Sequence, residues 1–316
     1  MKEMSKARVL SKRSINSVLN ERKILAQLKN NFIVNMQYAF QDRESLYLVM
    51  DLLGGGDLRF HISRYRRFTE EQTRFFVACI VYSLEYIHNK SILHRDIKPE
   101  NLVFDLKGYL RVTDFGIARI WNPDNAKETS GTPGYMAPEV MCRQNHGVAV
   151  DYFAVGVIAY ECMMGRRPYV GKSRKEIRDH ILSKQVQVRR QEIPPDWSIE
   201  GADFINRLIQ RKPTSRLGLN GPKEVKAHPW LKDFPWADLE RGDLKSPFVP
   251  PNKDNFDVAN SNGEWKDQED EAMVKNQALL RRDSVQELFA EYYYDENYAL
   301  LADKCAPPLS RNKPNK

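Results

Sequence analysis

Cysteine is scarce in this sequence, and the few cysteines show no pattern of metal binding or disulfide pairing. The 316-residue chain has four of them, with no C-x-x-C pair and no histidine at the spacing of a zinc site. This usage is typical of thiols in a reducing compartment, so we expect all four to be buried. They are Cys79, Cys142, Cys162 and Cys305.

Long apolar runs are also missing. The most apolar stretch, VAVDYFAVGVIAYECMM at 148–164, is shorter than a bilayer requires and contains two acidic residues, so we expect a core helix. The N-terminus has no apolar segment of the kind found in secretory signals. Its early excess of basic residues would also fit a transit peptide, although the segment runs directly into a structured pattern. The sequence favours the cytoplasm, with the nucleus as a second location.

Apart from the basic N-terminus, the charged residues are spread along the chain. Lys+Arg number 49 against 42 Asp+Glu, and the net charge of +7 is spread along the chain rather than gathered in an arm or a stripe. This balance weakly favours acidic partners such as nucleotides and gives no support for a nucleic-acid partner. There are no internal repeats, and the length suits a two-lobed globular protein.

Hydrophobic spacing and turn residues predict an α+β organisation. Apolar residues at helical spacing, capping residues and strand-like runs indicate where elements begin and end. A tail rich in proline, asparagine and charge is expected to run extended from about residue 234. The predicted helices are 14–28, a long helix after the capping-box sequence Thr69–Gln72, about 151 to Gly165, 173–184, 201–210 and about 267–293; the predicted strands are 45–53 and a pair within 101–112 joined at Gly108.

Three short motifs carry the strongest signal. HRDIKPEN occupies 94–101, DFG follows at 114–116, eighteen residues after Asp96, and APE occupies 137–139. Each triplet alone is weak, and Asp96 could simply cap a turn before a hairpin. Together, in this order and at these separations, they resemble a eukaryotic Ser/Thr protein kinase. Further matches are Asp151, Arg216 with Glu139, and AHPWL at 227–231.

The chemistry of phosphoryl transfer explains these residue types. An alcohol must be aligned, a triphosphate held and positive charge concentrated around the moving phosphoryl group. Asp96 would accept the proton of the alcohol and orient it, and Lys98 would reach the transferred phosphate. Asn101 and Asp114 offer oxygen ligands to Mg²⁺, which with ATP is the implied cofactor. Thr132 in GTPGY resembles the Ser/Thr branch rather than the tyrosine branch.

Within the kinases the chain resembles the AGC group, that of the cyclic-nucleotide-dependent and C-type kinases, over about residues 1–257. The segments LVMDLLGGGDL, GTPGYMAPE, GRRPY and FVPPNKDNFD carry this resemblance. It implies a bilobal fold, with Met50 as gatekeeper and the adenine bound by backbone atoms of the segment that follows. The residues implied around the nucleotide are Met50, Asp51, Leu53, Asp57, Glu100, Val103 and Thr113.

Three acidic residues coincide with the positions at which basophilic members of the group hold substrate arginines. They are Asp57, Glu100 and Glu161, and a guanidinium needs such carboxylate partners. We therefore expect protein substrates with Arg two or three residues before the target Ser or Thr, although solvated surface acids would look the same in a sequence.

The activation segment departs from the pattern of the group. Glu128 stands where a phosphorylated threonine is expected, so it would supply part of the charge that Arg95 needs, or Thr129 would be the site in a shifted register. In the tail, RRDSV at 281–285 has the form of a preferred substrate. Ser284 is a candidate for autophosphorylation or for inhibitory docking, or it lies on an ordinary charged helix. FAEYYY at 289–294 faintly resembles the hydrophobic motif of AGC tails, although its aromatic residues are equally typical of ordinary packing, which we favour.

The N-terminus completes the resemblance and raises its main question. Lys2 and Glu21 are 19 residues apart, which fits the lysine of the third kinase strand and the glutamate of the following helix. On this reading the first two strands and the Gly-rich loop are absent, and no G-x-G-x-x-G occurs. The expected organisation is a partial N-lobe at 1–50, a C-lobe at 51–233 and a tail at 234–316. Two hypotheses remain: an active Ser/Thr kinase, acted on by an unidentified upstream kinase or regulatory subunit, or a kinase-like scaffold with little transfer activity.

Overall fold

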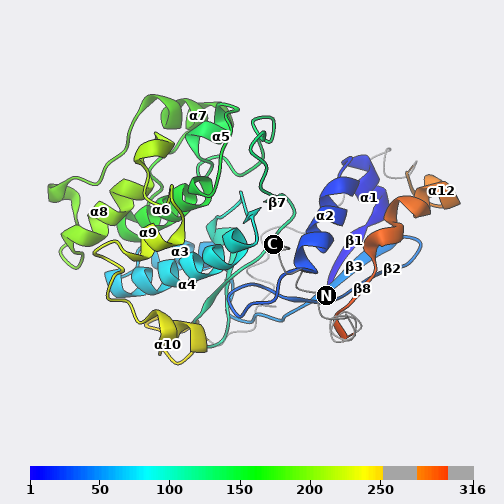
Figure 1. Ribbon diagram of the computed structural model, residues 1–316, viewed down its shortest axis with the longest axis horizontal. Coiled ribbons are helices and arrows are strands. Elements are labelled where there is room, and N and C mark those ends of the chain that lie inside the picture. Colours follow the sequence, from blue (N-terminus) through cyan, green and yellow to red (C-terminus); the bar gives the residue numbers. More distant parts are fainter. Residues whose placement is uncertain (252–275, 298–316) are drawn as a thin grey trace, which may run out of the picture. The chain divides into compact units, whose positions relative to one another are not determined.

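The computed structural model describes residues 1–251 and 276–297, which fall into two compact units. The smaller unit comprises Met1–Gln27, Asn35–Asp51 and the described part of the tail from residue 276. The larger unit comprises Leu28–Val34 and the described residues from Leu52 onward to 251. Figure 1 shows a small sheet with few helices in one unit and mainly helices in the other, which confirms the predicted α+β class.

The smaller unit is built on a four-stranded sheet in the order β1-β3-β2-β8. Strands β1, β2 and β3 are antiparallel to their neighbours, and the register places Lys2 opposite Leu48. Helix α2 lies beside the sheet (Figure 1), and its Glu21 contacts Lys2 of β1. The elements are β1 (Lys2–Ser5), α1 (Lys6–Ser11), α2 (Ile15–Leu25), β2 (Met36–Gln41), β3 (Ser45–Met50), α12 (Asp283–Gln286), η5 (Glu287–Tyr292) and β8 (Tyr294–Asp295).

The tail completes this unit through aromatic packing. Phe289 and Tyr292 of η5 are fully buried, and β8 pairs with β2. Arg22 of α2 donates from Nε to the carbonyl of Tyr292, 3.2 Å, and from Nη2 to the carbonyl of Tyr293. Lys6 lies over the ring of Phe289, 5.1 Å from its centroid, and donates to Gln286 Oε1 at 2.7 Å. The tail motif is therefore an integral part of the smaller unit.

The single helix predicted at 267–293 is wrong for the part that the structure describes. Residues 276–279 are helical, a break follows, and the short helix α12 leads directly into the 3₁₀ helix η5. Residues 267–275 lie outside the described range. The aromatic residues of the tail have to enter the core of the smaller unit, so side-chain packing rather than helical periodicity decides the backbone path here.

The larger unit is mainly helical and has two short two-stranded sheets, β4-β7 and β5-β6. Its strands are β4 (Ile92–Leu93), β5 (Leu102–Phe104), β6 (Leu110–Val112) and β7 (Arg119–Ile120). Its helices are α3 (Leu58–Tyr65), α4 (Glu70–Asn89), η1 (Pro99–Asn101), α5 (Pro138–Met141), α6 (Ala149–Met164), α7 (Arg174–Ser183), η2 (Arg190–Glu192), α8 (Ile199–Leu208), η3 (Pro213–Ser215), α9 (Pro222–Lys226) and α10 (Trp236–Arg241).

Helix α6 forms the centre of the larger unit, with α4 and α8 packed against it (Figure 1). It begins two residues before the predicted start and ends where expected, because Gly165 adopts the left-handed conformation with φ of 69°. The α4 capping box formed by Thr69 and Gln72 is confirmed. Gly156 allows close packing, since a Cβ there would lie 2.5 Å from the Cβ of Leu208 on α8. The acidic residues within α6 thus sit on a rigid element.

The predicted hairpin within 101–112 is confirmed as β5 and β6, with Gly108 at φ of 87° in the turn. The triple glycine pairs with β5: Gly55 N–H donates to the carbonyl of Phe104 at 2.9 Å, and Phe104 N–H donates to the carbonyl of Gly56 at 2.9 Å. A Cβ at Gly55 would come within 2.6 Å of the Cβ of Phe104. Glycine is therefore required for this close approach, which holds the start of α3 against β5.

Two expectations about individual segments need correction. The stretch after residue 234 is not wholly extended, because α10 forms at Trp236–Arg241 and ends at Gly242 in the left-handed conformation. Cys142 is exposed, since it follows the one-turn helix α5, whereas Cys79 and Cys162 are buried as predicted and Cys305 lies outside the described residues. Burial raises the pKa of the Cys79 thiol to about 12.

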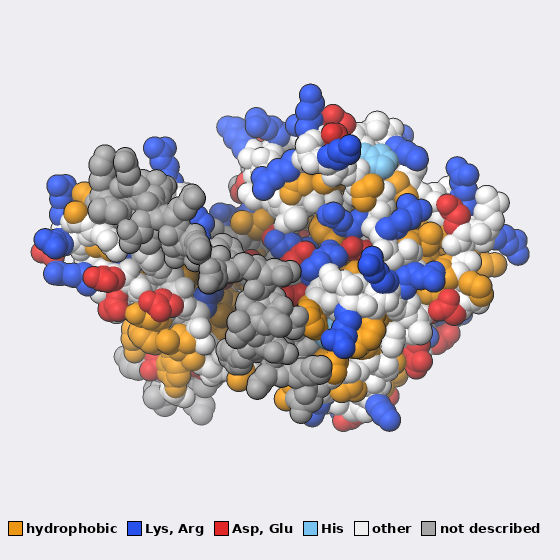
Figure 2. Space-filling view, turned by 180° about the vertical axis from the view of Figure 1, so that it is seen from behind, with side chains coloured by type: hydrophobic (Ala, Val, Ile, Leu, Met, Phe, Trp, Pro, Cys, Tyr) orange, Lys and Arg blue, Asp and Glu red, His pale blue; other side chains and the backbone are white. Residues whose placement is uncertain are grey.

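The surface agrees with the charge distribution expected from the sequence. Figure 2 shows Lys and Arg side chains interspersed with acidic, hydrophobic and uncharged groups on the face in view. Among the described residues no helix is long and apolar enough to cross a membrane.

Candidate active site

Asp151, which is buried near the start of α6, holds the backbone of the HRDIKPEN segment at 94–101. Its Oδ2 accepts the backbone N–H of His94 at 3.0 Å, and its Oδ1 accepts that of Arg95 at 2.8 Å. His88 of α4 lies 2.8 Å from Oδ2 through Nε2. Burial alone would raise the pKa of Asp151, but the contact with His88, the charge of His94 and the hydrogen bond from Arg95 N–H together outweigh it, and the pKa lies below its ordinary value. A charged carboxylate thus fixes the backbone before Asp96.

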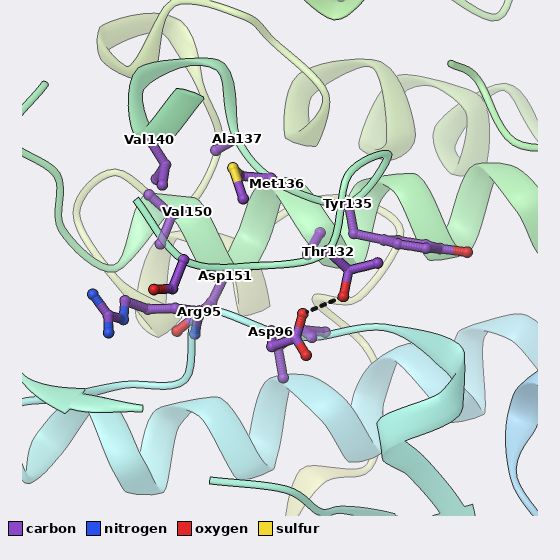
Figure 3. Close-up of a pocket in the computed structure, with 12 residues that line it drawn as sticks. Arg95, Asp96, Thr132, Tyr135, Met136, Ala137, Val140, Val150 and Asp151 are labelled. Carbon is purple, nitrogen blue, oxygen red and sulfur yellow. Dashed lines mark hydrogen bonds between the residues drawn. The ribbon is translucent and has the colours of Figure 1, made fainter. Parts of the chain in front are cut away.

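Asp96 is held by three side chains of the larger unit. Its Oδ1 accepts the hydroxyl of Thr132 at 2.7 Å, the contact dashed in Figure 3, and its Oδ2 accepts Lys98 Nζ at 2.7 Å. Lys98 also donates to Thr132 Oγ1 at 2.9 Å. Asn101 donates from Nδ2 to the backbone carbonyl of Asp96 at 3.0 Å and to Oδ2 at 3.2 Å. The structure therefore brings together four residues that the sequence singled out.

The DFG segment is tied to this loop by backbone contacts. Thr113 N–H donates to the carbonyl of Asn101 at 2.9 Å, and His94 Nε2 lies 3.1 Å from the carbonyl of Thr113. Phe115 is fully buried with its ring centroid 5.0 Å from that of His94. Asp114 has a φ of 60°, and its side chain is exposed, with Oδ1 accepting Gly116 N–H at 3.2 Å. Its carboxylate is thus presented outward on an otherwise packed turn.

Asn101 and Asp114 offer a donor set that fits Mg²⁺. Both provide oxygen, which a hard cation prefers, and Asn101 uses its amide nitrogen toward Asp96, so the amide oxygen is directed elsewhere. No group of three or more His, Cys, Asp or Glu side chains suited to a metal occurs in the described part of the chain. A metal here would therefore take its remaining ligands from nucleotide phosphates and water.

In the smaller unit, Lys2 and Glu21 form the expected pair. Lys2 Nζ lies 3.0 Å from Glu21 Oε1 and 3.3 Å from Oε2. The Glu21 side chain is 7% exposed and that of Lys2 41% exposed. Tyr292 of the tail packs near this pair: burial first, and the charge of Glu21 second, raise its pKa. The tail therefore supports the helix position from which Glu21 reaches Lys2.

The residues expected around the adenine are divided between the two units. Met50 ends β3 and Asp51 follows it, with Asp51 Oδ2 accepting Asn35 Nδ2 at 2.7 Å. Leu53 precedes the triple glycine, and Val103 lies on β5, where it bridges to Asp57. Thr113 directly follows β6. Their role around the adenine stays a prediction.

Two of the three acidic residues expected to bind substrate arginine, Glu100 and Glu161, contact Arg59, a side chain that the sequence does not single out. Arg59 donates from Nε to Glu100 Oε1 at 2.9 Å and from Nη1 to Glu161 Oε1 at 2.8 Å. Asp57 instead accepts Phe60 N–H at 2.8 Å as the N-cap of α3. The sequence carries no local signal for these contacts, because Glu100 and Glu161 lie 41 and 102 residues from Arg59.

Arg95 of the HRD motif contacts Glu128 of the activation segment, the stretch between DFG and APE. Arg95 Nη1 contacts Glu128 Oε2, and Arg95 Nε donates to the carbonyl of Ile117 at 2.9 Å. The Arg95 side chain is 3% exposed, and burial lowers its pKa although the Glu128 charge opposes this. Thr129 is exposed. In the tail, Ser284 is exposed on α12, within the described residues.

Glu139 of the APE motif pairs with Arg216 inside the larger unit. Arg216 Nη1 lies 2.6 Å from Oε1 and Nη2 lies 2.8 Å from Oε2, and the two side chains are 0% and 3% exposed. This bidentate pair joins α5 to the segment after α8 and fixes the end of the activation segment.

Comparison with known proteins agrees with this geometry. The protein kinase domain family matches residues 1–231, and the chain belongs to that family. A probable serine/threonine-protein kinase of Dictyostelium discoideum is 37% identical over 82% of this chain and 56% of its own length. From Caenorhabditis elegans, serine/threonine-protein kinase sgk-1 is 35% identical over 84% and 57% of the two chains, and a cAMP-dependent protein kinase, catalytic subunit-like, is 34% identical over 79% and 62%.

These relatives are Ser/Thr kinases of the AGC group, which confirms the resemblance seen in the sequence. The chain spans 56%, 53% and 57% of the lengths of three of the curated relatives that it matches, which is slightly more than half.

Proposed function

We propose that this chain transfers the γ-phosphoryl group of ATP to Ser or Thr side chains of proteins. The observation that carries the proposal is the arrangement around Asp96, whose carboxylate is oriented at once by Thr132, Lys98 and Asn101. Orienting an alcohol and stabilising charge at a fixed place are the main tasks of a phosphoryl-transfer site.

In this mechanism Asp96 Oδ accepts the proton of the substrate hydroxyl and aligns its oxygen for in-line attack. Lys98, which bridges Asp96 and Thr132, faces the same place and stabilises negative charge on the phosphoryl oxygens. The backbone that carries Asp96 is fixed by Asp151, so little reorganisation is needed when substrate binds.

Each unit contains residues that we propose for nucleotide binding. Asn101 and Asp114 would bind Mg²⁺, and Lys2, oriented by Glu21, would contact phosphate oxygens. When bound, the metal ion supplies Lewis-acid charge neutralisation to the triphosphate. Backbone atoms of Asp51 and Leu53 would bind adenine, with Met50, Val103 and Thr113 around the base.

The proposed substrates carry arginine before the target residue. Asp57, Glu100 and Glu161 supply carboxylates in the larger unit, the same unit that holds Asp96, and charge-assisted pairing with a guanidinium is directional. Activity would be partly independent of phosphorylation of the activation segment, because Glu128 contacts Arg95 and supplies part of the negative charge. Upstream kinases acting on Thr129 and modification of Ser284 would add regulation.

One observation favours a second function, that of a kinase-like binding protein. The sequence has no G-x-G-x-x-G motif, which in kinases covers the phosphates. A chain that lacks this cover would still bind peptide substrates through the larger unit while transferring phosphate slowly.

Phosphate transfer from labelled Mg-ATP to a Ser peptide with upstream arginines distinguishes the two. We expect transfer by the wild-type chain and loss of about a thousandfold in Asp96→Asn, since that variant keeps the shape but cannot accept the proton. Peptide binding without transfer by the wild type would favour the binding protein.

A further inference from the structure

Arg59 lies where an arginine of a substrate would be expected to bind. It projects from the first turn of α3 and makes contacts to two different elements, η1 through Glu100 and α6 through Glu161. A third contact joins Arg59 Nη2 to the hydroxyl of Tyr135, which itself donates to Glu161 Oε2 at 2.7 Å. The guanidinium group thus meets two carboxylates and a phenol oxygen in one place.

The geometry is that of a fully formed guanidinium site. Arg59 Nη1 and Nη2 approach the two oxygens of Glu161 at 2.8 and 3.2 Å, which is a bidentate arrangement, while Nε is used by Glu100. The Glu161 side chain is 6% exposed and that of Arg59 27% exposed. Burial lowers the pKa of Arg59, but its hydrogen bonds to Glu161 and Glu100 and the charges of Tyr135 and Glu161 together raise the pKa above its ordinary value, and Arg59 stays charged.

We propose that Arg59 occupies, from within the chain, the arginine subsite formed by Glu100 and Glu161. The wild-type protein would then select only one upstream arginine of a substrate, through Asp57. This inference rests on the proposed kinase function and narrows its substrate class. Asp57 remains outside the contact, because its carboxylate caps α3.

Competition explains why the intramolecular arginine would prevail. A side chain held on the same rigid helix has an effective concentration on the order of millimolar or above, whereas a peptide arginine must also lose its own freedom on binding. A substrate arginine that displaced Arg59 would gain only contacts that the protein already has. The preference for a substrate arginine at this subsite should therefore be weak, and it should depend on which residue stands at position 59.

The test compares peptides that carry Arg or Ala separately at positions two and three before the target Ser. For the wild type we expect a preference for Arg at one of these positions and less than about threefold discrimination at the other, read as the ratio of kcat/KM values. In Arg59→Ala, the indifferent position should gain a preference of about tenfold or more, mainly through KM, because one charge-assisted bidentate contact becomes available to the peptide.

Two controls keep the result specific. Arg64→Ala removes an exposed arginine from the same helix and should leave both ratios unchanged. Adding Glu161→Gln to Arg59→Ala should abolish the gained preference. If Arg59→Ala does not fold, Arg59→Leu can replace it in the same comparison, because leucine fills more of the space left by the arginine.

The outcomes separate this inference from the kinase proposal. If the wild type phosphorylates no peptide, the proposed function fails. If it does phosphorylate peptides but prefers Arg strongly at both positions, or if the Arg59 variants keep the wild-type ratios, the occupied subsite is overturned. Wild-type indifference at both positions, followed by a gain in Arg59→Ala, supports the occupied subsite and removes the role given to Asp57.

Discussion

The two units hold their charged residues in different ways. In the larger unit, Asp96 and Asp151 each contact several groups from other segments, and Glu139 pairs with Arg216 out of solvent. In the smaller unit, the proposed phosphate-orienting lysine has Glu21 as its ion-pair partner and is 41% exposed. The larger unit is thus preorganised by a network, whereas the smaller one depends on the sheet, α2 and the tail to keep a single pair in place.

The largest effect is expected when a proposed Mg²⁺ ligand of the larger unit is removed. Asp114→Ala should lower phosphate transfer about a thousandfold, because Mg²⁺ then loses a charged ligand and the triphosphate loses neutralisation. Rates measured across a range of Mg²⁺ concentrations would show this. Asp124→Ala, which removes another exposed carboxylate of the larger unit, should leave the rates unchanged. Equal losses in the two variants would contradict the metal role.

Breaking the buried pair should cost stability rather than chemistry. Glu139→Gln leaves the charge of Arg216 without its partner at 0% exposure, and we expect a loss of about 3 kcal/mol or more in the free energy of unfolding. Thermal and denaturant unfolding would measure it. Asp243→Asn, at an exposed pair with Arg241, is the control and should not shift the midpoint. Equal unfolding midpoints for the two variants would mean that the buried pair contributes no more to stability than the exposed pair.

In the smaller unit the corresponding change should have a moderate effect. Glu21→Gln should lower kcat/KM for ATP by about tenfold to a hundredfold, since Lys2 keeps its charge but loses its orientation. Steady-state kinetics with varied Mg-ATP would check this. The control is Glu3→Gln. Glu3 lies on β1, as Lys2 does, and accepts Ser45 Oγ at 2.9 Å, so this variant should keep the wild-type kcat/KM for ATP. An unaffected Glu21→Gln enzyme would remove Lys2 from the mechanism.

The smallest effect is expected in the activation segment. Glu128→Gln should lower activity a few-fold, because Arg95 stays in place through the carbonyl of Ile117. Phosphatase treatment of the wild type should leave its activity unchanged. If the treatment abolishes activity, phosphorylated Thr129, and not Glu128, completes the segment.

The sequence predicted well those parts that depend on local chemistry and fixed spacing. The capping box at Thr69, the left-handed Gly165 and the hairpin turn at Gly108 each follow from one or two residues, and all three are confirmed. Asp96, Lys98 and Asn101 come together because they share one short motif that a buried carboxylate anchors, and Thr132 joins them from the GTPGY motif.

The parts that could not be predicted depend on long-range packing. The path of the tail is fixed by Phe289 and Tyr292 entering the core of the smaller unit, and helical periodicity carries no information about that. Arg59 was missed because its partners lie 41 and 102 residues away, and an arginine at a helix start looks like an ordinary surface charge. The exposure of Cys142 likewise depends on how α5 ends.

The most direct test of the account is a single-turnover measurement with excess protein, saturating Mg-ATP and a Ser peptide, run side by side on the wild type, Asp96→Asn and Lys2→Met. We expect the wild type to transfer phosphate, Asp96→Asn to lose about a thousandfold, and Lys2→Met to lose less than Asp96→Asn. Transfer by Asp96→Asn at the wild-type rate, or no transfer by the wild type, would contradict it.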